Sequence, residues 1–294
     1  MRREAPTRRT RHLFFLGICG PALAVLAAGA VAVPGSRATR LPDQESAFPP
    51  AVDWHFPVGE RMEYSVTLGG LRLGEGSLTI EAVDTLWSQP SYRVAWEMEG
   101  GPPFYRVQDR QVSWMRPGPL TSLRFDQQLR QGGYRRDRRY LLDPDSLTYT
   151  RYDAVDGRYV ADASERSVPI PPGALDEVSF LFLARLLPLE VGRRFEFDSY
   201  FQEERNPVIL EVLRREEIRV PAGRFETVVV RPIIKAGGMF GEGGEAEVYV
   251  SDDERRLIVR LKTWMKVGSG NMYLTRYEPG DPAGLIAAGD GAGP

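Results

Sequence analysis

The stretch Ala174-Leu-Asp-Glu-Val-Ser-Phe-Leu-Phe-Leu-Ala-Arg-Leu-Leu-Pro188 decides the predicted fold, because after the N-terminal segment it alone has a clear helical pattern. Asp176 can accept hydrogen bonds from the free amides of a first turn, and Pro188 ends the run. The residues between them are almost all apolar, which is typical of a helix surrounded by protein. The helix would be roughly 20 Å long, too short for a bilayer of ~30 Å. We therefore predict a buried helix from Asp176 to Leu187.

The segments on both sides of this helix alternate between apolar and polar residues, as β-strands do. Turn signals such as Gly69-Gly70, Gly132-Gly133 and Asp143-Pro-Asp145 separate them. The predicted strands are 60–68, 71–83, 91–99, 104–115, 120–130, 134–142, 147–152, 193–201, 208–217, 225–234, 245–250, 257–266 and 271–277. The expected fold class is mainly β: a curved antiparallel sheet or open β-barrel, with the one buried helix on its concave side.

The N terminus has the pattern of a bacterial export signal. Residues 1–38 contain six arginines against one glutamate, an apolar run from Leu13 to Val33, and small-residue cleavage signals at Ala30-Val-Ala32 and Ser36-Arg-Ala38. The apolar run is also long enough to stay as a membrane anchor, although cleavage is favoured. We expect an exported protein of the periplasm or cell envelope, whose N-terminal segment engages the membrane or the export machinery.

The remaining chain divides into three parts. Residues 39–53 read as a flexible spacer, 54–278 as a single β-rich domain, and the Gly-, Ala- and Pro-rich residues 279–294 as a disordered tail.

Several kinds of chemistry lack the residues that they need. Cys19, in the signal segment, is the only cysteine, and His55 is the only histidine after that segment. Disulfides, the usual zinc sites and a Ser-His-Asp triad are therefore not expected. We predict no cofactor, no metal and no catalytic residues. Because the basic residues of the signal segment are removed from an almost neutral chain, the remainder is acidic, which argues against nucleic acid as a partner.

Three pairs of residues are candidates for binding a ligand. Trp96 and Trp114 could line an apolar pocket of a curved sheet, or belong to an ordinary core. Arg136 and Arg138 alternate with Arg135 and Arg139, so that they face the other way, and could grip phosphate or carboxylate headgroups; the alternative is a solvated edge strand.

The third pair, Met239 and Phe240, lies in the glycine-rich stretch 237–244, where it could act as a flap over a hydrophobic ligand or contact a membrane or partner. The alternative is that both side chains fold back onto the sheet.

Two acidic stretches, Asp252-Asp253-Glu254 and Asp143-Pro-Asp145, could hold a hard cation or supply a carboxylate pair. Both also have the composition of a turn, because Asp accepts local backbone hydrogen bonds. We interpret them as turns.

Five stretches, in this order, resemble the exported bacterial family of domains of unknown function numbered 3108. They are Gly59-Glu60 with Tyr64; Gly70 with Gly74-Glu75-Gly76; Leu175 to Gly192; Val220-Pro-Ala-Gly-Arg-Phe-Glu-Thr227; and Val248-Tyr-Val-Ser-Asp-Asp-Glu-Arg-Arg-Leu257. The resemblance covers most of 56–277 and implies an envelope protein with a β-rich domain. It brings no catalytic residues. Such domains look like the half-open barrels of periplasmic lipoprotein and lipid carriers, a likeness of fold alone.

These observations favour a non-enzymatic envelope protein that binds an apolar or amphipathic ligand such as a lipid or lipidated peptide. Two alternatives remain open. One is a structural or protein-interaction module that offers strand edges and the 237–244 loop to an envelope partner. The other is a polysaccharide hydrolase that uses two carboxylates, which would have to lie roughly 5 to 9.5 Å apart in a cleft.

Overall fold

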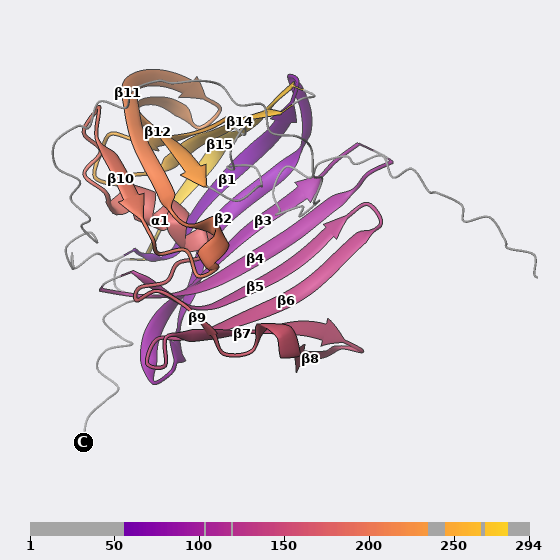
Figure 1. Ribbon diagram of the computed structural model, residues 1–294. Helices are drawn as coiled ribbons and strands as arrows, with labels where there is room; N and C mark the ends of the chain where they lie inside the picture. The colour runs from indigo at the N-terminus through magenta and orange to yellow at the C-terminus, as the bar shows by residue number, and fades with distance from the viewer. Residues whose placement is uncertain (1–55, 103, 119, 235–244, 266–267, 282–294) are drawn as a thin grey trace, which may run out of the picture.

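The computed structural model describes residues 56–102, 104–118, 120–234, 245–265 and 268–281, which form one large antiparallel sheet and one α-helix (Figure 1). The strands are β1 (Val58–Leu68), β2 (Leu71–Leu86), β3 (Gln89–Gly100), β4 (Val107–Arg116), β5 (Thr121–Gln131), β6 (Tyr134–Asp143), β7 (Thr148–Val155), β8 (Arg158–Ala161), β9 (Val168–Pro169), β10 (Arg194–Phe197), β11 (Val208–Val220), β12 (Gly223–Ile234), β13 (Glu245–Ser251), β14 (Ile258–Met265) and β15 (Gly268–Asp281). The helix is α1 (Glu177–Leu186). The predicted signal segment and spacer lie outside the described residues.

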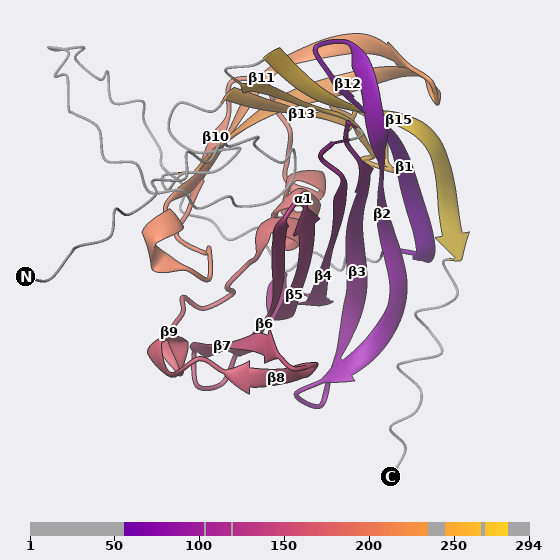
Figure 2. The same ribbon diagram turned by 90° about the vertical axis from the view of Figure 1, so that its right-hand side faces the viewer.

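The sheet is a meander whose first and last strands meet. Strands β1 to β8 follow one another across the sheet, and β10 to β15 follow one another back until β15 pairs with β1. Strand β9 pairs with β7, and β8 and β10 form the two ends of the strand order, so the sheet does not close into a barrel. Figure 2 shows how the sheet curves around α1. The predicted fold class is confirmed.

The N-terminal end of α1 is fixed to the inner face of the sheet, the face that surrounds the helix. Asp176 caps the helix by accepting hydrogen bonds from the backbone N–H groups of Val178 and Ser179, at 2.9 and 3.0 Å. The Ser113 hydroxyl of β4 donates to the other carboxylate oxygen of Asp176 at 2.6 Å. Ser122 of β5 donates its backbone N–H to the Ala174 carbonyl at 2.8 Å. The sequence therefore sets the helix start through a cap that also bonds to the sheet.

A core of apolar side chains fills the space between α1 and the inner face. Alternation along the strands turns side chains such as Met62, Leu78 and Val94 inward, where each has at most 1% of its surface exposed. Aromatic rings in this core pack on one another at centroid distances of 4.8 to 6.4 Å, among them Phe56–Phe182, Tyr140–Phe201 and Phe125–Phe201.

Two differences from the predicted strands have local causes. Strand β8 was not predicted, because four residues are too few to show an alternation. Strand β15 continues through Pro279 to Asp281, which we had assigned to the tail, and Asp281 pairs with Val58. A Cβ at Gly280 would lie 2.4 Å from the Glu60 backbone nitrogen, so the glycine permits this close pairing rather than ending the strand.

Candidate functional site

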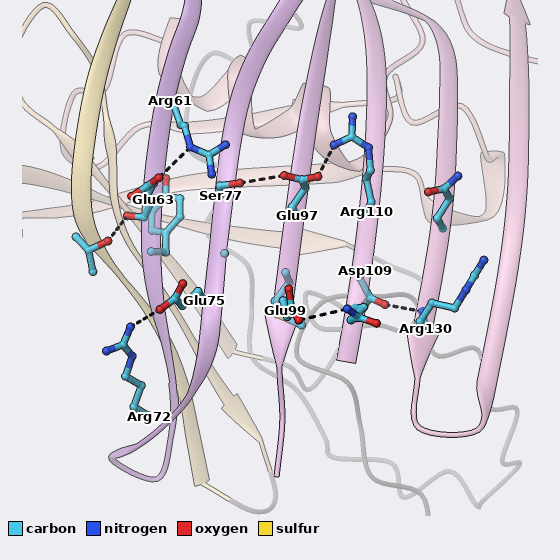
Figure 3. Close-up of a pocket in the computed structure, with 16 residues that line it drawn as sticks. Arg61, Glu63, Arg72, Glu75, Ser77, Glu97, Glu99, Asp109, Arg110 and Arg130 are labelled. Carbon is cyan, nitrogen blue, oxygen red and sulfur yellow. Dashed lines mark hydrogen bonds and ion pairs between the residues drawn. The ribbon is translucent and has the colours of Figure 1, made fainter. Parts of the chain in front are cut away.

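A hollow of about 590 Å³ lies on the outer face of β1 to β5, the face turned away from α1 (Figure 3). We call it the outer groove. Its floor is made by polar residues that alternate with the inward core residues of the same strands. They include Arg61 and Glu63 on β1, Ser77 on β2, Glu97 on β3, Arg110 on β4 and Arg130 on β5.

Ion pairs connect these strands across the centre of the groove. Arg110 reaches two carboxylates: it forms an ion pair with Glu97 and another with Glu81, the latter at 2.6 Å. On β1, Arg61 pairs with Glu63 at 3.0 Å and donates to the Thr79 hydroxyl at 2.8 Å. Because each of these side chains is held by a partner on the same or a neighbouring strand, the groove presents charges at fixed positions.

The end of the groove near the β1–β2 turn has the same balance of charges. Arg72 pairs with Glu75 at 2.6 Å, and Arg106 pairs with Glu99 at 2.5 Å. These pairs are more exposed than those at the centre, so each contributes little to folding stability. The groove as a whole is therefore strongly polar but has no large excess of either charge.

A second hollow of about 310 Å³ adjoins the outer groove over β2 to β5 and shares Arg110 and Gln128 with it. Trp114 and Val112 contribute an apolar patch to its wall. The Trp114 indole N–H donates to an Asp84 carboxylate oxygen at 2.7 Å, and the guanidinium of Arg124 lies 4.0 Å from the indole ring centroid. The indole is thus locked in place by a hydrogen bond and a cation–π contact.

Asp109 precedes Arg110 on β4 and turns its side chain to the inner face of the sheet, opposite Met98, where its pKa is strongly shifted. Burial raises the pKa of Asp109 to about 6, although hydrogen bonds from the Gln131 side chain and the Arg130 backbone N–H act in the opposite direction. The two bonds measure 2.5 and 3.0 Å. Near pH 6 a large share of Asp109 is therefore protonated, whereas aspartates and glutamates in water are almost fully ionised at that pH.

Trp96 and Trp114, the two candidate pocket residues, lie on opposite faces of the sheet. Trp96 is buried in the inner core, where its ring lies 5.9 Å from that of Tyr64. The pairing of β3 with β4 places Trp96 opposite Gln111 and Trp114 opposite Arg93, which faces outward. Because Gln111 and Trp114 are three residues apart on one strand, they point in opposite directions. The two tryptophans therefore do not line one pocket, and only Trp114 borders an outer hollow.

Arg136 and Arg138 face inward, as alternation predicts, and each has a partner. Arg136 donates to the Gln127 side chain at 3.1 Å, and Arg138 pairs with Asp153 at 2.8 Å. Arg139, on the other face, pairs with Asp126. Strand β6 lies between β5 and β7, so our alternative of a solvated edge strand is wrong. Met239 and Phe240 lie outside the described residues.

The acidic stretches make the local hydrogen bonds of turns. The Asp143 carboxylate accepts from the backbone N–H groups of Asp145 and Ser146 at 2.9 and 3.2 Å, and hydrogen bonds from Ser146 and Asp145 lower its pKa. Asp253 accepts from Ser251 and Arg255 in the same manner. Within the part of the chain that the structure describes, no group of three or more His, Cys, Asp or Glu residues could hold a metal ion.

The outer groove was not predicted from the sequence, although a pattern of polar residues pointed to it. Arg61 and Glu63, Glu75 and Ser77, and Glu97 and Glu99 are polar pairs spaced by two residues on three consecutive predicted strands. That spacing places each pair on one face, yet only the strand register shows that the pairs lie side by side.

A family comparison now places the chain. Residues 63–275 match the model of the family described as protein of unknown function (DUF3108). The chain belongs to this family. No match was found among curated proteins. In the described residues, no helix has the length and apolarity needed to cross a membrane.

The fold of this DUF3108 protein also resembles solved structures. A β-barrel-like protein of the family DUF1849 from Brucella abortus has a TM-score of 0.49 and 8% identity, covering 77% of this chain and 99% of that one. A candidate lipoprotein from Parabacteroides distasonis has a TM-score of 0.27 and 12% identity, covering 79% and 98%. A candidate exported protein with a YmcC-like fold from Bacteroides fragilis has a TM-score of 0.28 and 11% identity, covering 77% and 99%. These similarities are too distant to carry an argument about ligand or activity.

Proposed function

We propose that this DUF3108 protein is a non-enzymatic, exported binding protein of the cell envelope that holds a polar, polyhydroxylated chain, such as an envelope glycan, across the outer groove. The observation that carries the proposal is the floor of the groove, where arginine and glutamate side chains lie intermixed over β1 to β5 and pair with one another. Export rests on the signal pattern of residues 1–38.

The mixture of both charges in the groove limits the class of ligand. A strongly anionic ligand would meet Glu63 and Glu97, and a strongly cationic one would meet Arg61 and Arg110, so either would be repelled by half of the groove. Hydroxyl groups can donate to a carboxylate and accept from a guanidinium at the same time. Because a guanidinium carries five N–H donors, the ion pairs within the groove leave further donors for a ligand. The adjoining hollow beside Trp114 extends the surface for a longer chain.

The inner face offers less support for the apolar ligand that the sequence favoured. Its apolar residues pack against α1, whose Phe182 and Leu183 are at most 1% exposed. Binding without catalysis is supported by two observations. Residues 56–294 contain neither His nor Cys, and the groove glutamates Glu63, Glu75 and Glu97 are each engaged by an arginine rather than arranged as a free acid and base.

Isothermal titration calorimetry tests the proposal, with a panel of chitohexaose, soluble peptidoglycan fragments and O-antigen polysaccharide, and a mixed Lys/Glu peptide for comparison. We expect a glycan of the panel to bind and the peptide not to bind. Arg110→Ala removes the guanidinium that bridges Glu97 and Glu81 and should weaken binding about tenfold or more, the effect of losing a charge-assisted hydrogen bond.

The matched control is Arg194→Ala on β10, the strand at the far end of the sheet order, which breaks a half-exposed pair with Glu211 on β11. It should leave the affinity unchanged. Binding of the peptide alone, no heat from any glycan, or equal weakening by both variants would each contradict the proposal.

A further inference from the structure

Four hairpin turns at one end of the sheet share a pattern that the outer groove does not explain. They join β1 to β2, β3 to β4, β5 to β6 and β7 to β8, and they end with Gly-Gly-Leu71-Arg72, Phe104-Tyr-Arg106, Gly-Gly-Tyr134-Arg135 and Val155-Asp-Gly-Arg158. In each, an apolar or aromatic residue precedes an arginine by one to three positions. Every second turn of an antiparallel meander lies at the same end, so these four turns follow one another along one edge (Figure 1). We call this edge the Arg rim.

The apolar side chains of the Arg rim protrude into solvent. Leu71 is 71% exposed, Phe104 76%, Tyr134 48% and Val155 53%. Eight large hydrophobic side chains are exposed in the described part of the chain, and these four are half of them. A single exposed apolar residue needs no explanation, but one on each of four successive turns forms a row.

The arginines give this row a positive charge. Asp156 is the only acidic residue in the stretches 69–72, 101–106, 132–135 and 155–158, against four arginines. Arg72 and Arg106 pair with Glu75 and Glu99 beside the turns. Among the described residues, Arg135 and Arg158 have no ion pair, so their charge is available to a partner.

Among the described residues, the hairpin turns at the opposite end of the sheet do not combine an exposed large apolar residue with an arginine one to three positions later. Trp87 in the β2–β3 turn and Leu147 in the β6–β7 turn are exposed, but neither is followed by an arginine within three positions. The β13–β14 turn carries both signs of charge, with Asp252, Asp253 and Glu254 followed by Arg255 and Arg256. Asp252 and Asp253 are partly neutralised by Arg215 and Arg255. The combination of protruding apolar residues with arginine therefore belongs to one end of the molecule and is not a general property of its turns.

We propose that the Arg rim docks on the surface of an anionic phospholipid bilayer. Leu71, Phe104, Tyr134 and Val155 enter the boundary between headgroups and acyl chains, and the arginines that follow them remain at the level of the lipid phosphates. At ~4.8 Å per strand the four turns extend over roughly 30 Å, which suits a plane better than a single pocket. Anionic lipid supplies the complementary charge over that whole distance. This proposal does not depend on the ligand of the outer groove.

Vesicle sedimentation tests the docking. The full chain is exported, recovered from the soluble periplasmic fraction, and mixed with vesicles of phosphatidylethanolamine and phosphatidylglycerol, or of phosphatidylcholine alone. We expect binding to the phosphatidylglycerol vesicles and weak or no binding to phosphatidylcholine. Arg135→Gln/Arg158→Gln should lower the partition coefficient about tenfold or more, because each arginine near an anionic surface contributes measurably to binding. Leu71→Ser/Phe104→Ser should lower it on both kinds of vesicle.

Two controls lie at the other end of the sheet. Arg219, exposed on β11 beside the β11–β12 turn, is changed to Gln, and Trp87, 47% exposed in the β2–β3 turn, is changed to Ser. Both variants should bind as the parent protein does.

An insertion measurement remains decisive if a rim variant folds poorly. Cys19 is the only cysteine, so in a Cys19→Ser background a polarity-sensitive dye can be placed at Phe104→Cys or at Trp87→Cys. Phosphatidylglycerol vesicles should shift the emission of the dye at position 104 to shorter wavelength and leave the dye at 87 unchanged. Equal shifts, equal binding to both kinds of vesicle, no vesicle binding, or rim variants that bind like the controls would each overturn the proposal.

Discussion

Arg185 in α1 and Glu60 in β1 form an ion pair inside the sheet through two contacts, Nη1 to Oε2 at 2.7 Å and Nη2 to Oε1 at 2.9 Å. Their side chains are only 1% and 3% exposed. The guanidinium also donates to the backbone carbonyls of Arg255 and Arg256 and lies 4.4 Å from the ring centroid of Phe56. The pair therefore connects the helix to the first strand and to the β13–β14 turn, two segments that are far apart in the sequence.

Arg185→Met should lower the free energy of unfolding by about 3 to 5 kcal/mol, because it leaves the Glu60 carboxylate buried without its charge partner. Urea denaturation monitored by circular dichroism measures the change. In the double variant Arg185→Met/Glu60→Gln much of the loss should be recovered, since the buried charge is gone.

The comparison for this prediction is Arg194→Ala, which breaks the half-exposed pair with Glu211 and should cost about 1 kcal/mol or less. A loss of that small size for Arg185→Met would show that the buried pair does not anchor the helix.

Two buried aspartates should make the folded state less stable as the pH rises. Burial raises the pKa of Asp109 and that of Asp176 to about 6, against 3.8 for an unperturbed aspartate. Between these values the folded state binds more protons than the unfolded state, so the free energy of unfolding falls with increasing pH and levels off above about pH 6. In Asp109→Asn the total decrease in the free energy of unfolding across that pH range, measured by urea denaturation, should be smaller by up to about 3 kcal/mol.

Asp143 gives the opposite sign and serves as the control. Hydrogen bonds from Ser146 and Asp145 lower its pKa, so its carboxylate stabilises the folded state above the pKa of the unfolded chain, and this contribution is lost as the pH falls through the folded value. Asp143→Asn should therefore reduce the loss of stability in acid. If Asp109→Asn changed the pH dependence in that same direction, the assignment of a raised pKa would be wrong.

The sequence predicted the fold well where local signals decide it. Asp176 and Pro188 mark the helix through groups that act within one turn, and alternation marks each strand by itself. Alternation does not show which residues of two different strands share a face of the sheet. Trp96 and Trp114 are separated by an even number of residues, yet they lie on opposite sides because the 101–106 loop sets the β3–β4 register.

The outer groove depends on the same kind of information. Its central ion pairs bring Glu81 from β2 and Glu97 from β3 to Arg110 on β4. No local pattern shows which strands are neighbours. For the same reason an edge strand remained an alternative for β6, since its pairing with β7 could not be derived from its own residues. Alternation along each strand therefore predicts which residues face outward, but not that they come together in the outer groove.

Gly74 should tolerate no side chain, because β2 passes close to the end of β3. A Cβ at position 74 would lie 2.2 Å from the Glu99 carbonyl oxygen and 2.8 Å from the Gly100 Cα, both backbone atoms that cannot move aside without disturbing the sheet. Gly74→Ala should lower the free energy of unfolding by about 1 to 3 kcal/mol, with a lower melting temperature. At Gly133 a Cβ meets nothing within 4 Å, so Gly133→Ala should change stability by about 0.5 kcal/mol or less. Equal effects of the two changes would contradict the close approach.

The hydroxyl of Ser113 should matter more at neutral pH than in acid. It donates at 2.6 Å to the Asp176 carboxylate, which is fully buried at the start of α1, and this bond favours the charged form of the carboxyl. Ser113→Ala should lower the free energy of unfolding by about 1 to 3 kcal/mol above pH 6, where Asp176 is ionised and loses a donor. Below about pH 4 the protonated carboxyl has less need of that donor, and the loss should be smaller.

Urea titrations at both ends of this range measure the difference. Ser164→Ala is the matched control, because its hydroxyl makes the same kind of bond, at 2.6 Å, to Asp162 on the exposed surface. There water can replace the hydroxyl, so the control should lose about 0.5 kcal/mol or less at either pH. If Ser113→Ala were as mild as Ser164→Ala, or equally costly at both pH values, the helix cap would not depend on a charged Asp176, and its attachment to β4 would have to come from apolar packing alone.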